Sequence, residues 1–97
     1  MVNYLIMGKF TDLGIKNVKE TIARSERFKE MAKECGVTIT ETMWLTGDYD
    51  VFSLAQAEDE KSIATLLLKA GSRGYVKTNS YRAFTKDEVT EMAKNLG

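Results

Sequence analysis

The chain is 97 residues long, which is the size of one domain, so we expect residues 1–97 to fold as a single unit. Lys plus Arg and Asp plus Glu both total 14, giving a formal net charge of zero, whereas a domain that binds nucleic acid phosphates normally carries a clear positive excess. The chain has no histidine, which excludes catalysis by imidazole. It has one cysteine, which excludes an internal disulfide and, without histidine, a Cys/His zinc site. We therefore expect no nucleic acid partner, no metal and no cofactor.

The N-terminal residues, the apolar runs and the single cysteine bear on where in the cell the protein is expected. No basic stretch precedes an apolar core at the N-terminus, so we expect no secretion signal. The longest apolar run, Tyr4–Met7, is far shorter than the 18 or so residues that cross a bilayer. Cys35 falls at the end of an expected helix, where it is predicted to be a buried apolar residue and not an activated thiol. These features predict a cytoplasmic protein that does not enter a membrane.

Hydrophobic periodicity defines the first half of the chain. Residues 2–10 alternate in a way that predicts a strand with apolar side chains on both faces. A helix of about four turns follows, with Thr21 as its expected N-cap, Gly36 as its stop signal and residues 12–17 as a separate short turn before it. Its apolar stripe consists of Val18, Ile22, Ser25, Phe28, Met31, Ala32 and Cys35.

A hairpin is the clearest feature of the middle of the chain. Strands are predicted over 37–45 and 49–57, and the two residues Gly47 and Asp48 suit a type II′ turn between them. In the first of these strands, one side is expected to carry the apolar residues Val37, Ile39, Met43 and Leu45, and the other a ladder of threonines that ends at Trp44.

The remaining elements follow from start and stop signals. Glu58 or Asp59 opens a second helix, whose stripe is Ile63, Leu66, Leu67 and Ala70, and the segment 71–74 ends it. A last strand is predicted over 75–84. Thr85 and Glu88 have the capping-box spacing of a short helix that reaches about Asn95.

The order of these elements predicts an α+β fold of the ferredoxin-like type, βαββαβ, with a C-terminal helix added. Its four-stranded antiparallel sheet has the strand order 4-1-3-2, and right-handed crossovers place both long helices on one face. The opposite face is left without cover although the strands are apolar on both sides. We therefore expect a homodimer, or an oligomer built from dimers, in which a second copy covers that face.

Three blocks of the sequence carry a family resemblance: Met7–Ile15, Gly47–Asp50 and Gly74–Thr85. Together they extend over nearly the whole chain, which is similar to the GYD-domain proteins, small proteins named for a Gly-x-Tyr-Asp segment. The resemblance implies a ferredoxin-like fold that assembles as a dimeric α/β barrel. It implies little about function.

The Gly47–Asp50 segment has a structural and a functional interpretation. Turn chemistry explains the segment if the Asp50 carboxylate accepts backbone N–H groups. In the functional interpretation, Asp50 and Tyr49 are weak catalytic candidates at the mouth of a barrel, able to bind an amine or move a proton. We favour the structural interpretation.

The wider set of ligand-binding candidates combines aromatic and cationic side chains. Trp44 and Tyr81 are suited to lining a pocket, although strand aromatics more often belong to a core or an interface. Arginine offers a fork for a carboxylate or phosphate, so Arg24 and Arg82, with Lys9, are candidates for an anionic ligand. The candidates are Trp44, Tyr49, Asp50, Tyr81, Arg24 and Arg82.

Charge is segregated along the chain. Residues 34–60 hold seven acids and no base, and residues 61–86 hold six bases and no acid. In the predicted strand order these segments reach opposite edges of the sheet, where they could meet between subunits, although exposed ion pairs contribute only about 0–1 kcal/mol.

The sequence thus predicts a homodimeric module that binds a small molecule or a protein and assigns it no activity. The alternative is a small cofactor-free enzyme of the dimeric barrel type, a monooxygenase or an isomerase, with Asp50 and Tyr49 or Tyr81 transferring protons. A third possibility, a purely structural interaction module, predicts a filled barrel.

Overall fold

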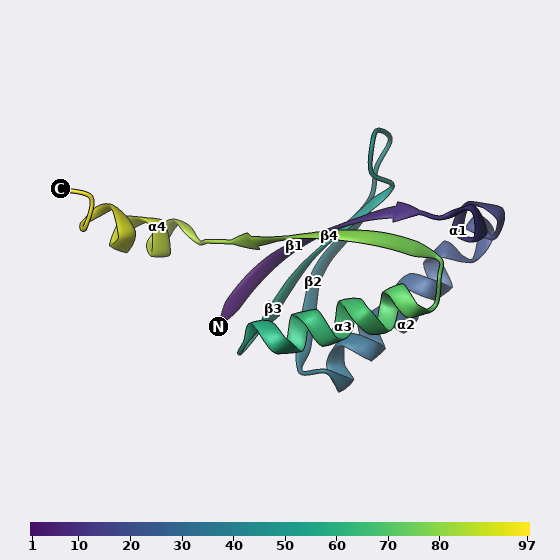
Figure 1. The fold of residues 1–97 in the computed structure, drawn as a ribbon, viewed down its shortest axis with the longest axis horizontal. Coiled ribbons are helices and arrows are strands. Elements are labelled where there is room, and N and C mark those ends of the chain that lie inside the picture. The colour runs from purple at the N-terminus through teal and green to yellow at the C-terminus, as the bar shows by residue number, and fades with distance from the viewer.

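The computed structural model describes all residues from 1 to 97, and its fold is the predicted one (Figure 1). Four antiparallel strands form one sheet in the order β2-β3-β1-β4. The elements are β1 (Val2–Phe10), α1 (Asp12–Lys16), a 3₁₀ turn (Val18–Glu20), α2 (Thr21–Glu34), β2 (Val37–Trp44), β3 (Val51–Ala57), α3 (Glu60–Ser72), β4 (Val76–Ala83) and α4 (Lys86–Ala93). None of the helices has the length and apolar character needed to span a membrane.

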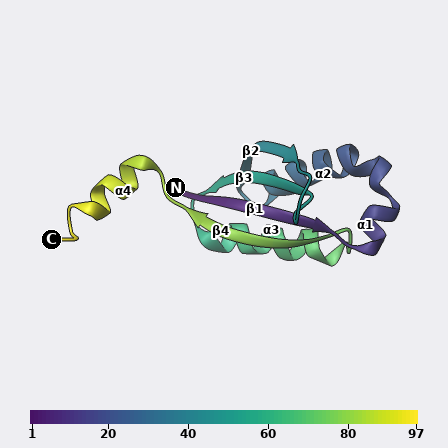
Figure 2. The ribbon, with the colours of Figure 1, turned by 90° about the horizontal axis from the view of Figure 1, so that it is seen from above.

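The molecule has two layers, because α2 and α3 lie against the same face of the sheet (Figures 1 and 2). Ile63 and Leu66 of α3 and Met31 of α2 are buried against that face. The nine residues of the hydrophobic core are Ile6, Met31, Ala32, Val37, Ile39, Ala55, Ala57, Ile63 and Leu66. Cys35 is only partly buried at the edge of this core, less than expected. No helix covers the opposite face of the sheet, and α4 projects beyond its end (Figure 2).

A β-bulge in β2 changes which side chains of that strand face the helices, compared with the prediction. The register shifts between Ile39 and Glu41, so Thr40 is an extra residue with no partner of its own on β3. Val37 and Ile39 face the helices, as predicted, but beyond the bulge the alternation is reversed and Met43 is 54% exposed on the open face. Placing Met43 on the same side as Val37 was therefore wrong, and Leu45 lies beyond the end of β2.

The hairpin is looser than the predicted two-residue turn. The register Trp44↔Val51 is the one that a turn centred on Gly47 and Asp48 requires. However, strand pairing ends there, and the Leu45 N–H donates to the Asp50 carbonyl at 2.8 Å to close a longer loop. Strand β3 accordingly begins at Val51 and not at residue 49.

The start of α2 also differs from the prediction. Residues 12–16 form the short helix α1, whose N-cap is Thr11, and the N-cap of α2 is Glu20, which makes no side-chain capping bond. Thr21 is the first residue of α2 and not its cap, and Ile22 is 57% exposed although its spacing placed it in the apolar stripe.

The other helix termini agree with the sequence. Gly36 has φ +80° after α2, Asp59 caps α3 through the Ser62 N–H, and Thr85 with Glu88 forms the predicted capping box of α4. The Thr85 backbone N–H donates to the Glu88 carboxylate and lowers the pKa of that group. Helix α4 ends at Ala93, two residues before the predicted end.

Candidate functional site

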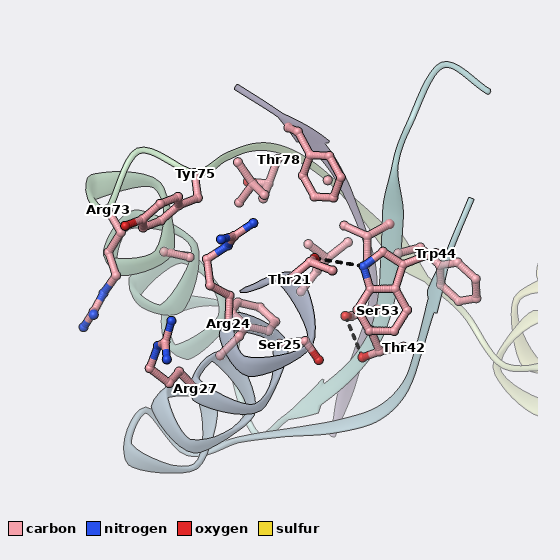
Figure 3. A pocket seen from close by; sticks show the side chains of 18 of the residues that line it. Thr21, Arg24, Ser25, Arg27, Thr42, Trp44, Ser53, Arg73, Tyr75 and Thr78 are labelled. Carbon is pink, nitrogen blue, oxygen red and sulfur yellow. Dashed lines mark hydrogen bonds between the residues drawn. The ribbon is translucent and has the colours of Figure 1, made fainter. Parts of the chain in front are cut away.

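A pocket of about 240 Å³ lies between the helices and the sheet, at the end where α2 begins and α3 ends (Figure 3). Its apolar wall includes Phe28 and Met31 of α2 and Val51 of β3. Ten of its 19 lining residues are hydrophobic, and none is acidic. Sites for drug-sized ligands span about 300–1,000 Å³, so this pocket suits a smaller molecule.

The bulge in β2 builds one polar wall of the pocket. Because the alternation reverses at Thr40, Thr42 and Trp44 turn toward the helices. The Trp44 indole N–H donates to the Thr21 hydroxyl oxygen at 3.0 Å, and the hydroxyls of Thr42 and Ser53 lie 3.0 Å apart (Figure 3). Trp44, a predicted ligand-binding candidate, is therefore a lining residue held in place by α2.

Arg24 supplies the positive charge inside the pocket. Its guanidinium lies 4.6 Å from the centre of the Tyr75 ring (Figure 3). It donates to the carbonyl oxygens of Asn17 at 2.9 Å and Gly14 at 3.3 Å, and no carboxylate lies within ion-pair distance. The guanidinium is therefore held by two carbonyls and an aromatic face, and no acidic side chain neutralises it.

Two further arginines line the pocket. Arg27 is one turn beyond Arg24 on α2, and Arg73 is the C-cap of α3. Both are exposed, neither forms an ion pair, and both also line an adjoining groove that contains Glu30 and Glu34. The mouth of the pocket is therefore cationic.

Asp50 makes structural contacts. Its carboxylate accepts the Phe10 backbone N–H at 2.8 Å, and its own N–H donates to the Gly8 carbonyl at 2.9 Å. The hairpin diverges from β1 at this point, and the carboxylate takes the place that a ladder carbonyl would otherwise fill. Asp50 does not line the pocket.

Tyr49 and Tyr81 belong to the open side of the sheet. The Tyr49 hydroxyl accepts from the Asn79 side-chain amide at 2.6 Å, and Asn79 shares a face of β4 with Tyr81. A hydrogen bond from Tyr81 to Tyr49 raises the pKa of Tyr81. These groups do not line the pocket, so the structure separates them from Arg24 and Trp44.

Arg82 contacts residues at the connection between β4 and α4. It lies 3.5 Å from the Glu88 carboxylate and 4.3 Å from the centre of the Phe84 ring, and it donates to the carbonyls of Asn3 and Ala83. Arg82 therefore anchors the junction between β4 and α4. Lys9 is exposed and, like Arg82, does not line the pocket.

Sequence reasoning did not select several polar and aromatic residues that line the pocket, among them Arg27, Thr42, Ser53, Arg73 and Tyr75. Of these, only Arg27 had a readable signal, its position three residues after Arg24 and beside the apolar stripe. No group of three His, Cys, Asp or Glu side chains is arranged to hold a metal ion.

The family model for the GYD domain matches residues 4–93. The chain belongs to the GYD domain family. This GYD protein is similar to a Thermus thermophilus protein described as a glutamine synthetase and cystathionine beta-lyase binding protein, with 30% identity over 87 residues, 86% of this chain and 88% of that protein. A crystal structure of a Thermus thermophilus protein superposes with a TM-score of 0.57 at 18% identity, covering 88% of this chain and 95% of that one. The latter likeness concerns the fold alone.

Proposed function

We propose that this GYD protein is a cytoplasmic, homodimeric binding protein whose pocket takes a small molecule. The observation that carries the proposal is the pocket itself, which combines apolar walls with hydroxyls and arginines. Its lining holds no carboxylate, thiol, imidazole or lysine, the groups that most often transfer protons or attack substrates. A binding role also agrees with the description of the Thermus relative as a binding protein.

The arrangement of the candidate catalytic groups gives the enzyme alternative less support. The Asp50 carboxylate is bonded through Oδ2 to the Phe10 N–H outside the pocket, and Tyr49 and Tyr81 do not line the pocket either. Binding therefore accounts for the pocket with fewer rearrangements.

A probe series tests the small-molecule role. Trp44 is the only tryptophan and lines the pocket, so its emission reports occupancy. Wild type is titrated with 3-phenylpropanoate, 3-phenylpropan-1-ol and 3-phenylpropylamine, and Ser25→Phe, which places a ring in the pocket, is the blocked control. We expect at least one probe to shift the emission of wild type and not of Ser25→Phe. If all three probes leave both proteins unchanged, the proposed function is wrong.

The open face of the sheet supports the homodimer. Strand register places two apolar rows across it, and Met43, Leu54 and Tyr81 are 54%, 39% and 48% exposed. The apolar residues of this open face are Leu5, Met7, Met43, Phe52, Leu54 and Tyr81. An apolar patch of this extent is unusual on a monomer, and a second copy presents the same surface.

Helix α4 adds a second surface without cover. Val89 and Met92 lie one turn apart on α4 and are 50% and 42% exposed, and Leu96, just beyond the helix, is 82% exposed. An eight-residue helix is marginal in isolation, so its stability requires packing against another surface. The projecting helix of one copy and the open face of another are suitable partners.

A charge placed on the open face tests the dimer. Leu54→Glu buries an unpaired carboxylate in the interface, which costs several kcal/mol, so we expect self-association to weaken by about 100-fold or more. Leu68→Glu is the matched control, because Leu68 is 76% exposed on α3. Light scattering should return a monomer for Leu54→Glu and a dimer for wild type and Leu68→Glu. A monomeric wild type at micromolar concentration would refute the dimer.

A further inference from the structure

The charge of the pocket differs from that of the chain as a whole. The chain is electroneutral, with 14 acids and 14 bases, yet the pocket is lined by three arginines and no acid. The arginines come from two elements far apart in sequence, Arg24 and Arg27 from α2 and Arg73 from the end of α3. The fold therefore concentrates positive charge at this one hollow.

Structural contacts use only part of the hydrogen-bonding capacity of Arg24. A guanidinium has five N–H donors, and the Asn17 and Gly14 carbonyls accept from Nη1 and Nη2. The remaining donors have no protein acceptor, and the Tyr75 ring fixes the plane of the group. An arginine with a fixed orientation and open donors is suited to bidentate recognition of a carboxylate or phosphate.

Arg27 and Arg73 have no structural partner. Neither forms an ion pair with Glu30 or Glu34, the acids of the adjoining groove, and Glu30 lies 3.5 Å from Lys33 instead. The bonds to the Gly14 and Asn17 carbonyls give Arg24 a structural role at α1, but Arg27 and Arg73 make no such bonds. Their charges are available to a ligand at the mouth of the pocket.

The rest of the pocket sets the size and character of the ligand. A dry apolar cavity of about 150 Å³ holds a benzene molecule, so about 240 Å³ admits one ring or a short branched chain together with an acid group. Phe28, Met31 and Trp44 offer contacts to such an apolar body.

We propose that the pocket binds a small organic acid, with its anionic group at the arginines and its apolar body against Phe28, Met31 and Trp44. This inference rests on the proposed small-molecule function and specifies the ligand class. A carboxylate and a phosphate monoester share the recognised chemistry, since both present two or more anionic oxygens to the guanidinium.

The same three probes test this ligand class, because they have nearly the same shape and differ in charge: one is an anion, one is neutral and one is a cation. At low ionic strength, we expect 3-phenylpropanoate to bind wild type at least about tenfold more tightly than 3-phenylpropan-1-ol, and 3-phenylpropylamine to bind most weakly. Phenethyl phosphate, titrated in parallel, distinguishes a phosphate preference from a carboxylate preference.

Arginine variants complete the experiment. Arg27→Gln/Arg73→Gln removes two exposed groups and should keep the wild-type melting temperature while the preference for the acid over the alcohol falls to about threefold or less. Lys19→Gln/Lys29→Gln changes the net charge equally outside the pocket and should leave the preference intact. Equal affinity of wild type for acid and alcohol, or an unchanged preference in the double arginine variant, overturns the ligand class and leaves the binding function standing. Failure of every probe to bind overturns both.

Discussion

Gly14→Ala should destabilise the protein by about 2–4 kcal/mol. A Cβ at this buried position would lie 2.0 Å from the carbonyl oxygen of Tyr75, an impossible contact with backbone that cannot rotate away. The same two segments are joined by bonds from Thr11, whose N–H donates to the Tyr75 carbonyl at 3.1 Å and whose hydroxyl donates to the Gly74 carbonyl at 2.5 Å. Relief of the clash must stretch these bonds and displace Tyr75 from Arg24.

Chemical denaturation of wild type, Gly14→Ala and Gly71→Ala measures this effect. Gly71 lies in α3, and a Cβ added there meets no atom within 4 Å. Gly71→Ala should therefore stabilise the protein by about 0.5–1 kcal/mol, through helix propensity alone. Equal stability of Gly14→Ala and wild type would contradict the close approach of α1 to Tyr75.

Asp50→Ala should lower the free energy of unfolding by about 1.5–3 kcal/mol. The substitution removes the charged acceptor of the Phe10 N–H, a part-buried donor at the end of β1. The hairpin loop is also expected to loosen, since the backbone of Asp50 bonds to both Gly8 and Leu45 beside that contact.

Asp48→Ala is the matched control for Asp50, because Asp48 is an exposed residue of the same loop and no hydrogen bond or ion pair involves its side chain. Urea melts should place Asp48→Ala within about 0.5 kcal/mol of wild type. An Asp50→Ala variant as stable as the control would refute the structural role and revive Asp50 as a functional group.

The sequence alone determined the order of the strands and long helices, and the hairpin register on the turn side of the bulge, from Glu41↔Leu54 to Trp44↔Val51. Strand β1 has the bounds that its alternation predicted, and the caps at Asp59 and Thr85 form as their spacing required. Such features are encoded within a few contiguous residues, because alternation, capping and tight turns each depend on neighbours in the chain. The GYD blocks added the family in the same way.

The candidate site was only partly readable from the sequence. Trp44 and Arg24 were selected as aromatic and cationic candidates, and both line the pocket. Asp50, Tyr49, Tyr81 and Arg82 were selected by the same chemical reasoning, yet the fold places them outside it. Residue type identifies groups that are able to bind a ligand and does not state which of them share a cavity.

Only the tertiary structure decided which side chains meet. The bulge at Thr40 arises where β2 pairs with β3, a strand on the far side of the hairpin loop, and it turns Thr42 and Trp44 into the pocket against the strict alternation of the sequence. Arg24 and Arg73 are brought to one pocket by the packing of α2 and α3 on a common face of the sheet. Pairing and packing of distant segments set these positions, whereas local periodicity acts over one or two turns, so the pocket and its charge appear only once the chain is folded.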